Sequence, residues 1–266
     1  MSVPSRALAR HGDVTIEVLG QGTGPLIVLL PSLGRGAGDF DAIADRLAEG
    51  GFRVLRPQPR GIGGSRGPMT AIDLHDYAAD IAAVIEHDGG GPAFVVGHAF
   101  GNRVARMLAT DRPELVAAVC LLAANVGHAP SPPAVREAIR NSANPSLPEA
   151  ERLRALRFAF FAPGNDPRVW LDGWYPDVLA AQRIAGDRTS REEDYAGGNA
   201  PLLYLQPDHD PLAHAEDAHA FKQALGDRVT IATIRNASHA AVAEQPGAIS
   251  GALIEYARRL WRLPPR

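Results

Sequence analysis

FVVGHAFGNR, residues 94–103, is the stretch that decides the fold class of this 266-residue chain. Its apolar start predicts a buried strand, and a helical pattern follows from Phe100. The turn 97–101 has the form G-x-A-x-G, which is the frame of G-x-S-x-G with Ala99 in the place of the serine. A strand–turn–helix of this form exposes its central residue at the carboxyl edge of a sheet, and small flanking residues let the strained turn close. The sequence therefore predicts that Ala99 occupies the position of a nucleophile, although a methyl group has no attacking atom.

Short apolar runs alternate with helical patterns along most of the chain. Such alternation favours an α/β fold, and continuous Val/Ile/Leu runs are typical of parallel strands that are buried on both faces. We therefore predict a doubly wound, mostly parallel sheet with helices on both sides, and a hairpin-like pair formed by 14–20 and 25–32. The other predicted strands are FRVLRPQPRG (52–61), AFVVGHA (93–99), VAAVCLLAA (116–124), PLLYLQPD (201–208) and RVTIATIRN (228–236).

Residues 131–199 interrupt this alternation. The segment starts with a proline-rich patch, continues with helical patterns, and concentrates aromatic residues between Phe158 and Tyr175. We therefore divide the chain into an α/β core, 1–130 and 200–266, and an inserted helical cap, 131–199. Because ligands sit in the cleft at the edge of such a sheet, we expect some cap aromatics to line an apolar pocket there, namely Phe161, Trp170 and Trp174.

The composition is that of an ordinary soluble globular protein. The chain is 45% hydrophobic and 21% charged with a net charge of −3, which gives no reason to expect nucleic acid or a membrane as a partner. No apolar run approaches the roughly 18 residues of a membrane span, and no signal peptide is recognisable. The single cysteine, Cys120, lies in an apolar run and is predicted to be buried, which fits a reducing compartment. We expect a cytoplasmic protein whose partner is a small-molecule substrate, and leave a homodimer open.

Two titratable residues follow the last two predicted strands. Asp210 comes just after the strand 201–208, and His239 just after the strand 228–236. The chain order of nucleophile position, acid and histidine is that of enzymes in which the acid orients an imidazole and the imidazole moves protons. We therefore predict that His239 is the base and that Asp210 orients it. Asp208, two residues earlier, is the alternative acid.

Across nearly its whole length the sequence resembles the α/β-hydrolase superfamily of lipases, esterases and epoxide hydrolases. The resemblance implies a sheet of that type with a helical cap after the sixth strand, a nucleophile elbow at Ala99, and an oxyanion hole formed by the backbone N–H groups of Leu33 and Phe100. Two departures are Pro31-Ser32 in place of the usual His-Gly, and the alanine at the nucleophile position. The stretches that carry the resemblance are LLPSLGRGAGDFD (29–41), RPQPRGIGGS (56–65), VVGHAFGNRVARMLATDRPE (95–114), LQPDHDPLA (205–213) and ASHAAVAEQP (237–246).

Ala99 leaves three interpretations open. In the first, the chain is a serine hydrolase captured with alanine in the place of its nucleophile. In the second, alanine is native, and the pair of His239 and Asp210 acts directly as a general base on water or on a substrate proton. In the third, the protein binds a small ligand without turnover. We favour an enzyme, hydrolase or lyase-like, that acts on a small to medium, largely apolar carbonyl compound by ester, lactone or C–C/C–O cleavage.

Three further polar residues lie beside the predicted site. Ser32, Arg35 and His98 are expected, together with the cap aromatics named above, to be substrate contacts. Each also has a plainer interpretation: a serine that bonds its own turn, a surface arginine, and a histidine packed beneath the bend.

No cofactor and no metal is predicted. GIGGSRG (61–67) and GRGAGD (34–39) do not complete the phosphate-binding pattern G-x-G-x-x-G. His214 and His219 near the DHD stretch have a spacing that suits a solvated helix better than a shared set of metal ligands.

Overall fold

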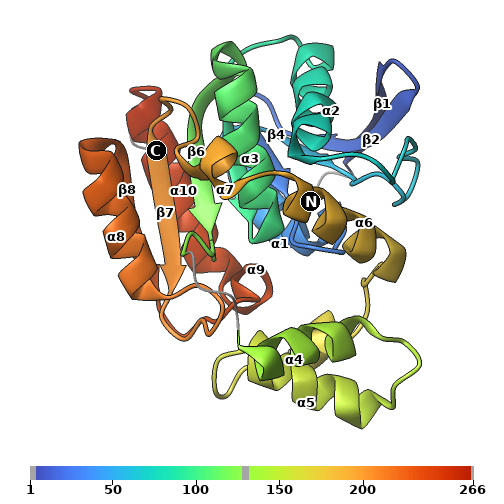
Figure 1. The fold of residues 1–266 in the computed structure, drawn as a ribbon. Coiled ribbons are helices and arrows are strands. Elements are labelled where there is room, and N and C mark those ends of the chain that lie inside the picture. Colours follow the sequence, from blue (N-terminus) through green and yellow to red (C-terminus); the bar gives the residue numbers. More distant parts are fainter. Residues whose placement is uncertain (1–3, 128–131, 265–266) are drawn as a thin grey trace.

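The computed structural model describes residues 4–127 and 132–264 and arranges them around one eight-stranded sheet (Figure 1). The strand order is β1-β2-β4-β3-β5-β6-β7-β8; the pairs β1·β2 and β2·β4 are antiparallel and the others are parallel. The predicted doubly wound, mostly parallel α/β sheet is therefore confirmed. The strands are β1 (Ser5–His11), β2 (Val14–Gln21), β3 (Leu26–Leu30), β4 (Arg53–Pro57), β5 (Ala93–His98), β6 (Val116–Leu122), β7 (Leu202–Pro207) and β8 (Val229–Ile234).

The two faces of the sheet carry different helices. α2 (Leu74–His87), α3 (Phe100–Asp111) and α8 (Ala215–Leu225) pack on one face, and α1 (Asp41–Glu49) and α10 (Pro246–Leu260) pack on the other. Because successive strand residues point to opposite faces, a strand covered on both sides must be apolar throughout, and every residue of β5 is buried. None of the helices in the described ranges has the length and apolarity needed to cross a bilayer. The remaining short elements are η1 (Ala37–Phe40), η2 (Pro113–Leu115), η4 (Gly226–Arg228) and α9 (Ala241–Glu244).

The predicted hairpin between 14–20 and 25–32 is wrong. β2 pairs with β1 and β4, and β3 lies on the far side of β4. The glycine-rich connection crosses the start of β4 so closely that a Cβ on Gly22 would lie 2.2 Å from the carbonyl oxygen of Phe52. These glycines therefore permit a close backbone crossing rather than a two-strand turn.

In its described part, the chain between β6 and β7 contributes no strand and is helical. Its helices are α4 (Pro133–Ala143), α5 (Glu149–Ala159), η3 (Pro167–Trp170), α6 (Pro176–Arg188) and α7 (Arg191–Tyr195). Figure 1 shows α4 and α5 beyond the ends to which the arrows of β6 and β7 point. In open α/β sheets this carboxyl end of the strands is where ligands bind. The division into core and cap stays a prediction, and part of its boundary, 128–131, lies outside the described residues.

A buried ion-pair cluster fastens α7 to α3. Asp194 is 1% exposed; its Oδ1 lies 2.8 Å from Nη2 of Arg103, and its Oδ2 lies 2.9 Å from Nη2 of Arg106. Arg106 is itself buried, and this burial lowers the pKa of its guanidinium. One carboxylate thus forms ion pairs with two guanidinium groups.

Asp194→Asn is expected to lower the free energy of unfolding by about 3–5 kcal/mol, because removing one partner of a buried ion pair leaves uncompensated charge. Urea unfolding followed by circular dichroism measures the change. Glu137→Gln, on the exposed side of α4, is the matched control and should alter stability by less than about 0.5 kcal/mol. If the Asp194 variant unfolds at the same urea concentration as the control, the cluster does not have this role.

Candidate active site

The chain bends sharply between β5 and α3, with Ala99 at the bend. Its φ of +49° and ψ of −111° lie where residues with a side chain rarely occur, so the backbone is strained. Both flanking positions require glycine, because other backbone segments lie too close to leave room for a Cβ atom. A Cβ on Gly97 would lie 2.3 Å from the backbone nitrogen of Asn102, and one on Gly101 would lie 2.5 Å from the carbonyl oxygen of Leu30. Packing around the bend therefore maintains the strain, although no hydroxyl is present.

His239 and Asp210 meet at the carboxyl edge of the sheet. His239 follows β8, Asp210 follows β7, and Nδ1 of the imidazole lies 2.9 Å from Oδ2 of the carboxylate, with both side chains buried. The other oxygen, Oδ1, accepts hydrogen bonds from the N–H groups of Leu212 at 2.8 Å and Ala213 at 3.1 Å. The fixed carboxylate orients the imidazole so that Nδ1 carries a proton. Within the described residues, Nε2 of His239 has no hydrogen-bond partner.

The alternative acid, Asp208, has a different set of partners. Its oxygens accept hydrogen bonds from the N–H groups of Asn236 at 3.1 Å and Ala237 at 3.2 Å, and Oδ1 lies 3.8 Å from Nε2 of His209. Asp208 thus braces the loop that leads to His239. The structure brings His239 together with Asp210 and not with Asp208.

His98, the last residue of β5, supports the imidazole from behind. Its side chain is 0% exposed, and its Nε2 donates a hydrogen bond of 2.7 Å to the carbonyl oxygen of His239. Burial lowers the pKa of His98 to about 3, and the nearby His239 and Arg35 act in the same direction. A ring that donates from Nε2 and stays neutral leaves Nδ1 without a partner among the described residues. His98 therefore holds the loop of His239 in position and does not face the cavity.

A cavity of about 230 Å³ contains Ala99 and His239 in its wall. Ligand cavities usually span roughly 300–1,000 Å³, so this one suits a small ligand. Its wall beside His239 is apolar, since the ring of Phe160 lies 5.7 Å from the imidazole between centroids. The sheet edge contributes Ser32, Leu33, Ala99, Phe100, Ala123, Leu212 and His239, and the segment between β6 and β7 contributes Ile139, Phe160, Trp174, Gln182, Arg183 and Arg191.

Two of the residues that were expected to contact substrate, Ser32 and Trp174, line this cavity. The other four are buried elsewhere: Arg35, His98, Phe161 and Trp170. Phe161, for example, packs edge-on against Trp170, with 6.0 Å between ring centroids. The lining ring next to it, Phe160, was not singled out. Neighbouring aromatics on one segment point in different directions, and the sequence pattern does not show which of them faces the cavity.

Arg35 is not a surface arginine, because only 3% of it is exposed. Its Nη2 lies 2.6 Å from Oδ1 of Asp39, and its Nη1 donates a 2.6 Å hydrogen bond to the carbonyl oxygen of Asp172. The guanidinium also lies 4.6 Å from the ring of Trp170 and 4.8 Å from that of Trp174, which are cation–π distances. Arg35 thus ties the loop after β3 to the segment before α6.

The backbone N–H groups of Leu33 and Phe100 both belong to residues of the cavity wall. Neither donates a hydrogen bond within residues 4–127 and 132–264. Phe100 is the first residue of α3, where N–H groups have no helical partner and the helix dipole is positive. This arrangement is suited to binding a negatively charged oxygen.

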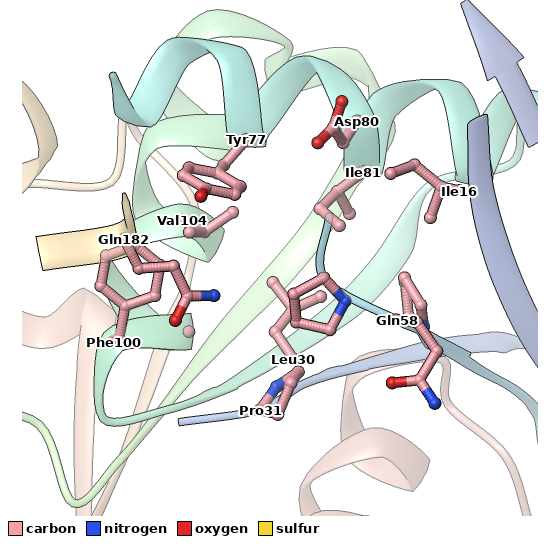
Figure 2. A pocket seen from close by; sticks show the side chains of 13 residues that line it. Ile16, Leu30, Pro31, Gln58, Tyr77, Asp80, Ile81, Phe100, Val104 and Gln182 are labelled. Atoms are coloured by element: carbon pink, nitrogen blue, oxygen red, sulfur yellow. The ribbon is translucent and has the colours of Figure 1, made fainter. Parts of the chain in front are cut away.

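Gln182 on α6 is a residue of the site that sequence analysis missed. It is 2% exposed, and its Oε1 accepts a 2.7 Å hydrogen bond from the N–H of Gly34 in the loop after β3. Gln182 and Phe100 also line a second cavity of about 40 Å³ (Figure 2). The hydroxyl of Tyr77, which has no hydrogen-bond partner in the described part of the chain, faces this second cavity. Gln182 and Phe100 therefore form a shared wall between the cavities. A glutamine in a helix carries no distinctive sequence signal, and only the fold brings it to this loop.

The chain matches the family described as "Alpha/beta hydrolase family" over residues 27–252. A 2-(acetamidomethylene)succinate hydrolase of Mesorhizobium japonicum is 33% identical over 108 residues, and epoxide hydrolase A of Mycobacterium tuberculosis is 32% identical over 126 residues. These alignments cover 41% and 45% of this chain, and 38% and 39% of the two relatives. The chain thus spans less than half of the length of the curated relatives that it matches.

Solved structures resemble this chain over nearly its whole length. A thermophilic esterase from Thermogutta terrifontis has a TM-score of 0.77, with 20% identity and coverage of 96% of this chain and 99% of that chain. An esterase from Exiguobacterium antarcticum has a TM-score of 0.75, with 17% identity and coverage of 94% and 98%. At such low identity the likeness shows the fold alone. The family match over most of the chain, on a sheet of the same architecture, shows that this protein belongs to the alpha/beta hydrolase family.

Proposed function

We propose that this protein is a hydrolase in which His239, oriented by Asp210, activates water directly, without a nucleophile at residue 99. The observation that carries the proposal is the 2.9 Å contact between Nδ1 of His239 and Oδ2 of Asp210 at a cavity that contains Ala99. A general base needs its proton-accepting nitrogen to point at the reacting group. A carboxylate that is hydrogen-bonded to the other nitrogen fixes the imidazole in that orientation. The named relatives are hydrolases, which supports this class of reaction.

The proposed step is attack by water on a carbonyl carbon. Ala99 has a methyl group where a serine would carry its hydroxyl, so a water molecule has room beside His239. As the water oxygen bonds to the carbonyl carbon, Nε2 of His239 takes one of its protons and Asp210 stabilises the resulting imidazolium. The carbonyl oxygen becomes an oxyanion, which the N–H groups of Leu33 and Phe100 bind. When the bond to the leaving group breaks, that group takes the proton back from His239.

We propose a small to medium, largely apolar carbonyl compound as the substrate. The cavity volume of about 230 Å³ and the rings of Phe160 and Trp174 in its wall support this size and character. We assign to the hydroxyl of Ser32, which lines the same cavity, a hydrogen bond to the substrate. The segment 131–199 acts as a cap in this proposal, because Phe160, Trp174 and Gln182 reach the cavity from it.

A second candidate function is a serine hydrolase whose nucleophile has been replaced by alanine. The strained backbone at Ala99, with φ of +49°, favours it, because such a bend serves to expose a nucleophile. The pair of His239 and Asp210 would then activate the missing hydroxyl. The two candidates differ in whether the protein with alanine turns over substrate.

His239→Ala is expected to lower kcat/KM by at least about 100-fold, because a positioned general base contributes roughly 10²–10⁴-fold to rate. The measurement is product release from a panel of nitrophenyl esters, lactones and N-acyl compounds, using the best substrate that the unaltered protein hydrolyses. His209→Ala is the matched control, since that imidazole is about half exposed and outside the cavity wall, and it should retain full activity.

Unchanged turnover in the His239 variant would refute the general-base mechanism. Tight ligand binding by the unaltered protein with no product from any compound would instead indicate a ligand-binding protein and overturn the hydrolase proposal.

Ala99→Ser distinguishes the two candidate functions. If water is activated directly, the protein with alanine is already active, and serine should raise kcat/KM by less than about tenfold. If the chain is a serine hydrolase without its nucleophile, serine should raise activity by about 100-fold or more and form an acyl-enzyme. Intact-protein mass spectrometry after brief exposure to a nitrophenyl ester detects that adduct. A large gain with an adduct on residue 99 therefore selects the second candidate.

A further inference from the structure

In the described part of the chain, three arginine side chains line the active-site cavity. They are Arg103 on α3, Arg183 on α6 and Arg191 on α7. α3 and α7 lie side by side in this part of the molecule (Figure 1), where Arg103 bonds to Asp194. Among the described residues of the cavity wall, Asp187 is the acidic one.

The charge of this cluster is not balanced by its own carboxylates. Asp194 is shared between Arg103 and the buried Arg106, so this pair of cations keeps one positive charge in excess. Arg183 and Arg191 add two more, against the single carboxylate of Asp187. The surplus lies in a chain whose net charge is −3, so the arginines of the cavity wall are a local excess of positive charge in a slightly negative protein.

The three guanidinium groups of the cavity wall differ in how many hydrogen-bond donors they have left. Arg103 uses its nitrogens on Asp194 and on the carbonyl oxygens of Gly186, at 2.8 Å, and Thr189, at 3.3 Å. Among the described residues, Arg191 donates one hydrogen bond, to the carbonyl oxygen of Gly127. Within residues 4–127 and 132–264, Arg183 makes no hydrogen bond or ion pair. Arg103 is therefore a structural tie, and Arg183 and Arg191 keep donors for a ligand.

We propose that the substrate carries a carboxylate, and that Arg183 and Arg191 bind it while the carbonyl group lies beside His239. This inference rests on the proposed function and narrows its substrate to an apolar acyl compound with an anionic end. The apolar part packs against Phe160 and Trp174, which line the same cavity. The guanidinium fork matches the two oxygens of a carboxylate, and charge-assisted hydrogen bonds of this kind are stronger than neutral ones. The two arginines thus act as positioning residues for the carbonyl group.

Calorimetric titration with 3-phenylpropionate and with its neutral isostere 3-phenylpropionamide tests the proposal. The acid should bind at least about tenfold more tightly than the amide, because hydrogen bonds to charged groups contribute that much or more. Added sodium chloride should weaken binding of the acid and leave the amide unaffected. Arg183→Gln and Arg191→Gln should each weaken binding of the acid by about tenfold or more, with little effect on the amide.

Arg188→Gln is the matched control, because it removes the same charge from the exposed side of α6, outside the cavity wall. This variant should change the affinity for the acid by less than about twofold, because Arg188, unlike Arg183 and Arg191, does not line the cavity. Equal affinity for acid and amide, or an equal loss in all three variants, would overturn the proposal.

The binding test is independent of turnover. If the protein hydrolyses neutral esters but binds the acid and the amide equally, the proposed function stands and the carboxylate site is refuted. If the protein binds the acid through Arg183 and Arg191 but hydrolyses none of the compounds, the carboxylate site stands and the proposed function is refuted.

Discussion

The hydrogen bond between Nδ1 of His239 and Oδ2 of Asp210, 2.9 Å long, is the contact on which the candidate site depends. Further hydrogen bonds fix both residues of this pair. Two backbone N–H groups bind the other oxygen of Asp210, and His98 binds the carbonyl oxygen of His239. The chain of contacts thus joins the carboxyl ends of β5, β7 and β8, so the position of the imidazole is set by the sheet rather than by a loop alone. Without this bond, the imidazole of His239 would lose the carboxylate that orients it as a proton acceptor.

The bend at Ala99 has two geometric consequences, and only one of them needs a hydroxyl. It places residue 99 in the cavity wall, and it leaves the N–H of Phe100, at the start of α3, without a hydrogen-bond partner among the described residues. A strained residue of this kind costs on the order of 1–3 kcal/mol, which the surrounding packing must offset. The close contacts at Gly97 and Gly101 supply that constraint from the backbone. An alanine at the bend therefore loses nucleophilic attack but keeps a donor suited to an oxyanion.

The wall of the cavity combines apolar side chains with positively charged ones. Beside His239 the cavity is bordered by Phe160 and Leu212, whereas α3, α6 and α7 contribute arginines. The same Asp194 that ties α7 to α3 leaves part of the arginine charge unbalanced, so a structural cluster also sets the potential of the cavity. Burial of Arg106 and Asp194 strengthens the electrostatic effect of this pair, because the interior screens charge less than water does. The proposed preference for an anionic ligand therefore involves the same carboxylate that ties α7 to α3.

Local sequence patterns were enough to identify the α/β class and the bend at Ala99, because the hydrophobic period and the placement of glycines are visible within short windows. The same patterns identified Asp210 and His239 as residues that directly follow strands. Strand order was not local: the hairpin expected between β2 and β3 is replaced by a crossing over β4. Likewise, Asp210 and not Asp208 reaches the imidazole of His239, and Arg35 is buried. Gln182 and the arginines of α6 and α7 also line one cavity. These outcomes depend on contacts between segments far apart in the chain, which packing of the whole sheet and its helices brings together.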